Sequence, residues 1–228
     1  MKKGRSIGII VASDSEMLPF LKIFGKPIDN YDYDGYKVCL WEENGIELYL
    51  VKSGYGEIAA AAATQFLITE FDVAGILNYG VVGSLKDDLS AMQIGVVQKI
   101  VHYGFDISGG GKYPVGRYPN QEDLFISPNK PTFEITDDLA LDSFVCASAD
   151  KFVYGGDPKR QLREQFGADI CEMEAAGIVL TCNKNGIPCT MIKAISDGVD
   201  EDEEAFDKNV EGASMRCVEI IQLLLQKS

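Results

Sequence analysis

Short apolar runs alternate with helix-forming segments along the chain, and this alternation limits the fold more than any single motif does. The runs at 6–12 (SIGIIVA), 74–80 (AGILNYG) and 188–197 (PCTMIKAISD) have the length and composition of strands buried on both faces. Residues 56–71 (GEIAAAAATQFLITEF) are alanine-rich and contain no breaker after the first position, which predicts a helix. The pattern favours an α/β fold over residues 1–228, organised as one three-layer sandwich with a central mixed sheet flanked by helices.

The remaining segments fit the same architecture. Further strands are expected at 36–42 and 46–53, joined by a turn at Asn44-Gly45, and at 94–108, 144–150 and 169–172. Further helices are expected at 157–166, 174–186 and 203–226, and after the Ser/Asp residues that follow the first strand. The apolar face of that first helix is predicted to comprise Met17, Leu18, Leu21 and Phe24. Residues 109–132 are rich in Gly, Pro and Asn, which predicts a long surface loop.

The charge of the chain argues against a nucleic-acid partner. The 228 residues carry a formal net charge of −14, whereas binding a phosphate backbone requires clustered Lys and Arg. No apolar run reaches the roughly 18 residues of a membrane span. The apolar stretch from Ile7 to Ala12 is too short for the core of a signal peptide and fits a first strand better. We therefore expect a cytoplasmic protein whose ligand is small and neutral or cationic.

The cysteines and the single histidine exclude several kinds of chemistry. Six cysteines are scattered without a C-x-x-C pair, and with only one histidine no zinc pattern can be built. Most of the cysteines lie in apolar segments and are expected to be buried thiols. A histidine-dependent nucleophile would have to use His102, which stands near the expected end of a strand, and this role is disfavoured. We expect neither a metal nor a cofactor.

Carboxylates follow four of the expected strands. They are Glu16, Asp150, the pair Glu172 and Glu174, and Asp197. Taken singly, each fits the first turn of a helix or a capping position, where a negative charge is stabilising. In open α/β folds, however, ligands bind at the carboxyl ends of strands. Several carboxylates at one rim repel one another and lose solvation, so their convergence is better explained by a binding or catalytic site.

The glycine-rich segments carry weaker information. Residues 108–116 (SGGGKYPVG) lack the G-x-x-x-x-G-K-[ST] pattern and open no helix, so a nucleotide-triphosphate loop is disfavoured. The segments at 54–57 (GYGE) and 80–84 (GVVGS) are predicted to form tight strand-to-helix turns that let the backbone approach a ligand.

Six motifs in a fixed order span nearly the whole chain. They are IGIIVASDSEM (7–17), LVKSGYGEIAAAAAT (50–64), NYGVVGSL (78–85), SADKFV (148–153), CEMEAAGI (171–178) and KAISDGVD (193–200). In this order they resemble the nucleoside phosphorylase/nucleosidase superfamily, and within it the chain is most similar to 5′-methylthioadenosine/S-adenosylhomocysteine nucleosidases. The resemblance implies a nucleoside phosphorylase-like fold and hydrolysis of the N-glycosidic bond of 5′-modified adenosines, with release of adenine.

The resemblance also implies roles for individual residues. Glu16 matches the glutamate that activates the attacking water, and Asp197 matches the aspartate that protonates purine N7, supported by Ser196. Met173 and Glu174 match the pair that binds the ribose. These residue types suit the reaction, because adenine leaves more easily when N7 is protonated and water needs a base to become a good nucleophile. A carboxylate near the ribose stabilises the positive charge that develops there.

The resemblance also assigns residues to the adenine ring, to the 5′ group and to the subunit interface. Phe152 matches the aromatic residue that stacks on adenine, and the backbone of Val153 matches the group that reads the base edge. Phe206 matches an aromatic residue near the 5′ side. Ile107 matches a residue that is lent to the neighbouring subunit's pocket, which implies a homodimer. Glu172 is expected to support the wall or the base end of the pocket.

The chain departs from the family pattern at several pocket positions. The family segment T-G-S-A-G-G is here Y-G-V-V-G-S, so that Gly80 is kept and Val81 replaces a serine that contacts phosphate in phosphorylases. This favours water over phosphate as the acceptor. Lys193 stands where arginine is usual, and Tyr55 is bulkier than the expected aliphatic residue. Two alternatives therefore remain open, a nucleoside phosphorylase and a nucleoside-binding protein without turnover.

Overall fold

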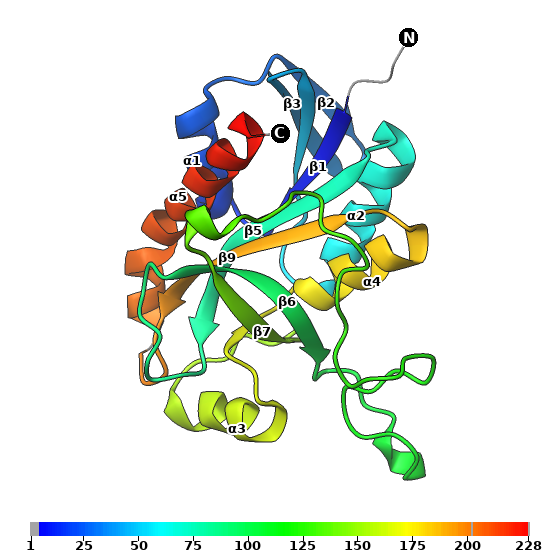
Figure 1. The fold of residues 1–228 in the computed structure, drawn as a ribbon, viewed down its shortest axis with the longest axis vertical. Coiled ribbons are helices and arrows are strands. Elements are labelled where there is room, and N and C mark those ends of the chain that lie inside the picture. Colours follow the sequence, from blue (N-terminus) through cyan, green and yellow to red (C-terminus); the bar gives the residue numbers. More distant parts are fainter. Residues whose placement is uncertain (1–4, 202, 228) are drawn as a thin grey trace.

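The computed structural model describes residues 5–201 and 203–227. The strands are β1 (Arg5–Val11), β2 (Asp29–Tyr33), β3 (Tyr36–Glu43), β4 (Ile46–Lys52), β5 (Gly75–Ser84), β6 (Ile94–His102), β7 (Asp142–Ser148), β8 (Ile170–Glu172) and β9 (Cys189–Asp197). The α-helices are α1 (Asp14–Phe24), α2 (Glu57–Phe71), α3 (Gly156–Phe166), α4 (Ala175–Asn185) and α5 (Glu203–Gln226). Figure 1 shows their arrangement.

The strands form one mixed sheet in the order β2-β3-β4-β1-β5-β8-β7-β6-β9. Strands β4, β1, β5 and β9 are linked by parallel pairings, whereas β2, β3 and β4 form an antiparallel meander. Strand β9 pairs with both β6 and β5, so that β5, β8, β7, β6 and β9 close on themselves in a ring. The mixed α/β sheet predicted from the alternating segments is confirmed. The ring closure has no counterpart in the sequence pattern, because it depends on long-range pairing.

Helices cover both faces of the sheet, because neighbouring residues of the central strands point to opposite sides. Ile7 and Ile9 of β1 pack in a cluster with α1 and α5, whereas Ile10 packs in a second cluster with α2 and α4. Figure 1 shows the α1–α5 pair on one side of β1 and β5 and the α2–α4 pair on the other. The predicted three-layer arrangement is therefore present.

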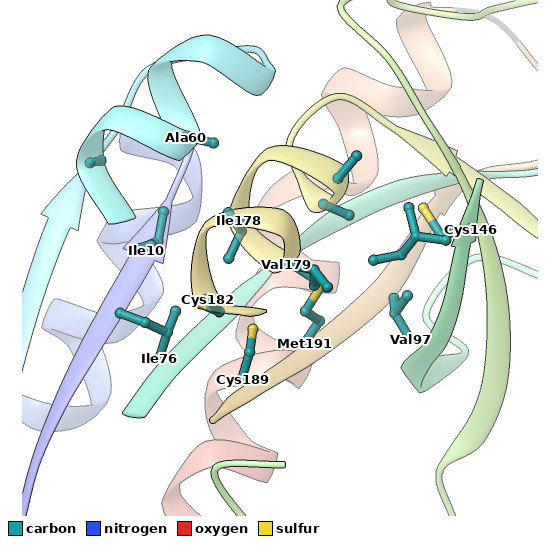
Figure 2. Close-up of a cluster of buried hydrophobic side chains, with 14 of the residues drawn as sticks. Ile10, Ala60, Ile76, Val97, Cys146, Ile178, Val179, Cys182, Cys189 and Met191 are labelled. Atoms are coloured by element: carbon teal, nitrogen blue, oxygen red, sulfur yellow. The ribbon is translucent and has the colours of Figure 1, made fainter. Parts of the chain in front are cut away.

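The core under α4 consists of aliphatic side chains and thiols. Figure 2 shows Cys182 of α4 next to Cys189 of β9, and Val179 of α4 next to Met191 of β9. Five of the six cysteines are buried, Cys39 is partly buried, and all six are free thiols. The expectation of buried thiols is confirmed for these five.

The boundaries of several elements differ from the sequence-based prediction. Strand β2 was not predicted, because its sequence DNYDY is mostly polar and exposed and shows no apolar pattern. Strand β5 continues to Ser84, so the segment GVVGS is extended strand and the predicted turn there is wrong. The hairpin turn between β3 and β4 is confirmed, with positive φ angles of 53° at Asn44 and 76° at Gly45.

The long connection between β6 and β7 lies largely outside regular structure, as predicted. It contains two short 3-10 turns, at Ser108–Gly110 and Asp137–Leu139. Its middle is held to the sheet at Ile126, whose N–H and C=O both bond to Ile100, at 2.7 and 2.8 Å. Within the described ranges, no helix is long and apolar enough to cross a membrane.

Helix α1 begins at a capping box in which Ser13 and Glu16 bond reciprocally to each other's backbone N–H. Its buried face centres on Phe20, whose ring lies 4.3 Å from that of Phe24 and 5.0 Å from that of Trp41. Leu18 is 50% exposed, so its assignment to the apolar face is wrong. The helical rotation places Phe20, with Met17, Leu21 and Phe24, on the side facing the sheet.

Replacing the aromatic anchor of α1 should destabilise the fold. We expect Phe20→Ala to lower the free energy of unfolding by about 3–5 kcal/mol, because it removes a fully buried ring. Leu18→Ala, on the same helix, should change it by less than about 0.5 kcal/mol. Denaturant unfolding of the two variants measures both values. Equal losses would contradict the assigned orientation of α1.

Candidate active site

A cavity of about 450 Å³ opens at the carboxyl ends of β1, β8 and β9 and beside the second half of β5. Its volume lies in the range of small-molecule sites. The lining comes from strand ends, two loops and the start of α5. It comprises Ala12, Ser13, Glu16, Tyr55, Val81, Val82, Gly83, Lys151, Phe152, Val153, Cys171, Glu172, Met173, Glu174, Asp197, Glu203, Phe206 and Asp207.

The structure brings most of the predicted site residues together in this cavity. Those that line it are Glu16, Val81, Phe152, Val153, Glu172, Met173, Glu174, Phe206 and Asp197. Three others lie outside the lining. Ser196 stands behind Asp197, Gly80 stands behind Glu16, and Ile107 lies partly exposed in the connection that follows β6.

Glu16 is held by three backbone N–H groups. Its Oε2 accepts from Ala12 at 2.7 Å and from Ser13 at 3.2 Å, and its Oε1 accepts from Val81 at 3.1 Å. Burial raises the pKa of Glu16, and the nearby Lys193 charge and these hydrogen bonds offset only part of that effect. A carboxylate with a raised pKa is a stronger base than an ordinary one.

Two glycines of β5 leave room for the carboxylates. A Cβ at Gly80 would collide with the Glu16 carboxylate, and one at Gly83 would lie 3.1 Å from Asp197 Oδ2. These glycines therefore act within an extended strand. Their role is to let buried carboxylates approach the backbone, and the predicted turn is not needed for it.

Asp197 ends β9 and is bonded through both of its carboxylate oxygens. The Ser196 hydroxyl lies 2.6 Å from Oδ1, and the Lys159 ammonium lies 2.5 Å from Oδ2. Lys159 comes from α3 and is completely buried. The sequence analysis missed it because α3 is rich in charged residues. The available signal was its helical spacing to the buried Leu162 and Phe166, which places all three on one face.

The two glutamates that flank Met173 play different parts. Glu172 points into the wall, where its carboxylate accepts from the N–H groups of Glu174 and Ala175 and from the Ser148 hydroxyl at 2.5 Å. Glu174 lines the cavity, and its Oε1 accepts from the N–H of Gly56 at 2.9 Å. Burial, with the neighbouring Glu172 charge, raises the pKa of Glu174 to about 8.

A buried lysine supplies positive charge to this group of carboxylates. Lys193 lies 3.4 Å from Glu172, and both side chains are almost fully buried. Burial alone lowers the pKa of Lys193, but Glu172, Glu174 and Glu16 together outweigh it, so the pKa is raised above its ordinary value. The ammonium at position 193 therefore stays charged and offsets their repulsion.

Glu57 is a buried carboxylate that the sequence analysis did not single out. The Ser148 hydroxyl lies between Glu57 and Glu172, and the N–H of Gly177 donates to the second oxygen of Glu57. A Cβ at Gly177 would collide with the Glu57 carbonyl, so this glycine lets α4 cross close to the first turn of α2. Burial, followed by the Glu172 charge, raises the pKa of Glu57 to about 8.

Asp150 does not join the other strand-end carboxylates in the cavity, so the expectation that all of them converge is wrong for this residue. Its Oδ1 accepts from the N–H of Glu57 at 2.6 Å and caps the start of α2, whose own N-cap residue is Gly56. His102 also lies outside the lining. Its Nδ1 is 2.8 Å from the Tyr118 hydroxyl, and burial lowers its pKa.

Aromatic side chains form one wall and the mouth of the cavity. The rings of Phe152 and Phe206 lie 5.5 Å apart and nearly perpendicular, at 81°. Phe152 is 44% exposed and Tyr55 is 70% exposed, whereas Val153 is buried. Exposed aromatic faces beside a polar floor suit a flat heterocyclic ligand.

The buried state of Glu57 should make folding stability depend on pH. Because its folded-state pKa is raised to about 8 from 4.5, its stabilising contribution is complete below about pH 4.5 and is lost as the pH rises through about 8. We expect Glu57→Gln to reduce the fall in melting temperature between pH 5 and pH 8.5. Glu70→Gln, near the end of the same helix, serves as the control. An unchanged slope in Glu57→Gln would contradict the prediction.

Comparisons with known proteins find nucleosidases among the relatives of this chain. An aminodeoxyfutalosine nucleosidase of Helicobacter pylori is 27% identical over 98% of this chain and 99% of its own length. A 5′-methylthioadenosine/S-adenosylhomocysteine nucleosidase of Shewanella frigidimarina is 26% identical over 97% and 99%. A crystal structure of a 5′-methylthioadenosine/S-adenosylhomocysteine nucleosidase from Helicobacter pylori with butyl-thio-DADMe-Immucillin-A matches with a TM-score of 0.91, 26% identity and full coverage of both chains. The family model described as "Phosphorylase superfamily" matches residues 6–226, so this chain belongs to that superfamily.

Proposed function

We propose that the protein hydrolyses the N-glycosidic bond of 5′-modified adenosines, such as 5′-methylthioadenosine and S-adenosylhomocysteine, and releases adenine. The observation that carries the proposal is the placement of Glu16 and Asp197, which come from different strand ends, in one cavity with Glu174. Similarity to nucleosidases over nearly the whole chain supports it.

The proposed mechanism divides acid and base roles between two carboxylates. Asp197 gives a proton to purine N7, and the Ser196 hydroxyl fixes one of its oxygens during the transfer. Glu16 accepts a proton from the water that attacks the anomeric carbon. Its three backbone hydrogen bonds hold both of its oxygens in place, which limits the reorganisation that the reaction requires.

The remaining cavity residues bind the two halves of the nucleoside. Glu174 accepts hydrogen bonds from the ribose hydroxyls, and Met173 packs beside it. As the bond to adenine breaks, positive charge develops on the sugar, and the carboxylates nearby stabilise it. Phe152 stacks on the adenine ring, and the backbone of Val153 contacts its edge. Glu172 keeps its place in the wall and orients the start of α4.

The cavity favours water over phosphate as the acceptor. Val81, an apolar side chain, lines the cavity, and the sequence resemblance implies that phosphorylases have a phosphate-contacting serine at this position. Six acidic side chains belong to the cavity lining, four of them buried, and this excess of acidic groups opposes the approach of an anion. Within the described lining the only cationic side chain is Lys151. A phosphorylase therefore remains the second candidate and is distinguished by its need for phosphate.

The 5′ side of the cavity bears on the substituent that the protein accepts. Phe206 is flanked in the lining by Glu203 and Asp207 of the first turns of α5. Two carboxylates at this end favour neutral or cationic 5′ groups over anionic ones. Because relatives of similar identity include both a methylthioadenosine-type and an aminodeoxyfutalosine nucleosidase, the substrate panel must contain both kinds of nucleoside.

We further propose that the protein acts as a homodimer. Several large apolar side chains are exposed, namely Tyr55 and Phe152 in the cavity lining, Ile58 and Tyr154 close to them in the chain, and Ile107 in the connection that follows β6. Covering such residues in a second copy would remove apolar surface from water. Ile107 is then the residue that reaches the neighbouring copy's pocket.

Turnover of a nucleoside panel tests the proposed reaction. The protein is incubated with 5′-methylthioadenosine, S-adenosylhomocysteine, aminodeoxyfutalosine and adenosine, with and without phosphate. We expect free adenine and free sugar from the 5′-thio nucleosides in the absence of phosphate. Asp197→Asn should lower kcat by about 10²–10⁴-fold, because it removes the general acid. Formation of a sugar 1-phosphate only when phosphate is present would establish the phosphorylase instead.

The raised pKa of Glu16 predicts the acid side of the pH profile. A general base must be ionised to act, so activity should fall as the pH decreases through the pKa of Glu16, which burial places above 4.5. We therefore expect kcat/KM to decline at a higher pH than an ordinary glutamate would cause. Measurement between pH 4 and pH 9 locates this limb. Full activity retained at pH 4.5 would contradict the assigned base.

A further inference from the structure

Lys159 occupies a position that is costly for a lysine. It lies in the first turn of α3, where the helix dipole is positive and disfavours a cation. Its side chain is completely buried. Its ammonium donates to Asp197 Oδ2 and to the carbonyl of Gly198, each at 2.5 Å. The lysine therefore brings a buried positive charge into contact with Asp197, the residue proposed as the general acid.

The backbone is shaped to let this lysine reach the carboxylate. Gly83 pairs with Asp197 across β5 and β9, directly after an irregularity in the strand register. A Cβ at this glycine would lie 3.4 Å from Lys159 Cε and 3.1 Å from Asp197 Oδ2. The glycine thus leaves space for both members of the pair at one point of the cavity wall.

A purely structural role explains this arrangement poorly. A buried ion pair contributes little net stability, because desolvation of both charges offsets their attraction. Helix α3 already has apolar anchors in Leu162 and Phe166, and Arg163 ties its end to Asp169 at 3.0 Å. The pair instead touches the cavity, since Asp197 is part of its lining.

We propose that Lys159 is a positioning residue for the general acid, holding one oxygen of Asp197 and stabilising the carboxylate that remains when the proton moves to purine N7. The proposal rests on the proposed function. In the step, the O–H bond of Asp197 breaks and the N7–H bond forms, while the electron pair of the glycosidic bond passes to the adenine. The ammonium keeps its protons throughout and lowers the energy of the anion that is produced.

Other charged and titratable groups surround the pair. From β8, the Cys171 thiol lies near both Lys159 and Asp197, and burial raises the pKa of Cys171 to about 12. From α5, Glu203 and Asp207 line the same cavity. From the segment after β9, Glu201 accepts from the N–H of Gly198 at 2.6 Å. Among these, Lys159 is the cation in direct contact with Asp197.

The alkaline side of the pH profile tests the role of the charge. The Lys159 ammonium contacts Asp197 Oδ2, so its removal takes away a charge that stabilises the carboxylate left after proton transfer. We therefore expect Lys159→Met to lower kcat about 10-fold and to move the alkaline limb of kcat/KM up by about 1–3 pH units. Lys159→Gln, which keeps a hydrogen-bond donor without the charge, should shift the limb in the same direction. Arg163→Met, in the same helix, should leave both quantities unchanged.

A second measurement does not depend on turnover. In Lys159→Met, the buried Asp197 has no cation to balance it, so the loss of melting temperature should grow as the pH rises from 4 to 8. When Asp197→Asn is also present, neither member of the pair is ionisable, and the loss caused by Lys159→Met should become small and nearly independent of pH. This double-mutant cycle isolates the interaction between the two side chains.

The outcomes separate the two proposals. Absence of adenine release by the wild-type protein would overturn the proposed function, and the stability cycle would then decide whether Lys159 acts on Asp197. Adenine release with an unmoved alkaline limb in both Lys159 variants would overturn the inference and leave the proposed function standing. Equal, pH-independent stability losses with and without Asp197→Asn would overturn it as well.

Discussion

The Lys193–Glu172 ion pair is the interaction around which the buried polar groups are arranged. Glu172 accepts hydrogen bonds from the first turn of α4, from Ser148 of β7 and from Lys193 of β9. Through Ser148 it is connected to Glu57 at the start of α2. The Glu172 carboxylate thus connects helices α2 and α4 with strands β7 and β9 at the floor of the cavity. Without the lysine, like charges would be buried together with no compensation.

This arrangement explains why the family motif around Met173 contains two acidic residues and a small-residue run. Glu172 fixes the backbone, Glu174 is presented to the cavity, and Gly177 allows α4 to approach the first turn of α2. Glu172, Glu174 and Gly177 therefore have three different structural roles. The substitution of lysine for arginine at 193 keeps the charge that these groups require, although it gives up the planar fork.

The sequence predicted the features that depend on residues close to one another in the chain. Strand and helix alternation predicted the α/β sandwich, and the capping pattern before Glu16 predicted the start of α1. The placement of Glu16, Glu174 and Asp197 at strand ends, together with the ordered motifs, predicted that they share a cavity. The polar strand β2 and the exposure of Leu18 were missed, because pairing partners and helix rotation are set by tertiary packing.

The buried charges were the hardest features to predict. Glu57 and Lys159 lie in helix first turns and have the residue types of solvated surfaces. Their burial results from contacts with residues that are distant in sequence, Gly177 for one and Asp197 for the other. Asp150 was wrongly predicted to lie in the cavity, because its position after a strand was taken to indicate a ligand site. A strand-end carboxylate can serve a neighbouring helix just as well as a ligand.

The ring of strands described above has a mechanical consequence. Val81, whose N–H holds Glu16, and Gly83, which pairs with Asp197, are two residues apart on β5. They therefore share a face and are separated by roughly 7 Å along the strand. Strand β5 pairs with β9 on one side and with β8 on the other. Val81 and Gly83 therefore cannot shift along the sheet unless backbone hydrogen bonds of the closed ring of strands break. Glu16 and Asp197 are thus held at a spacing that is set by the backbone geometry of β5 and does not depend on motion of the surrounding loops.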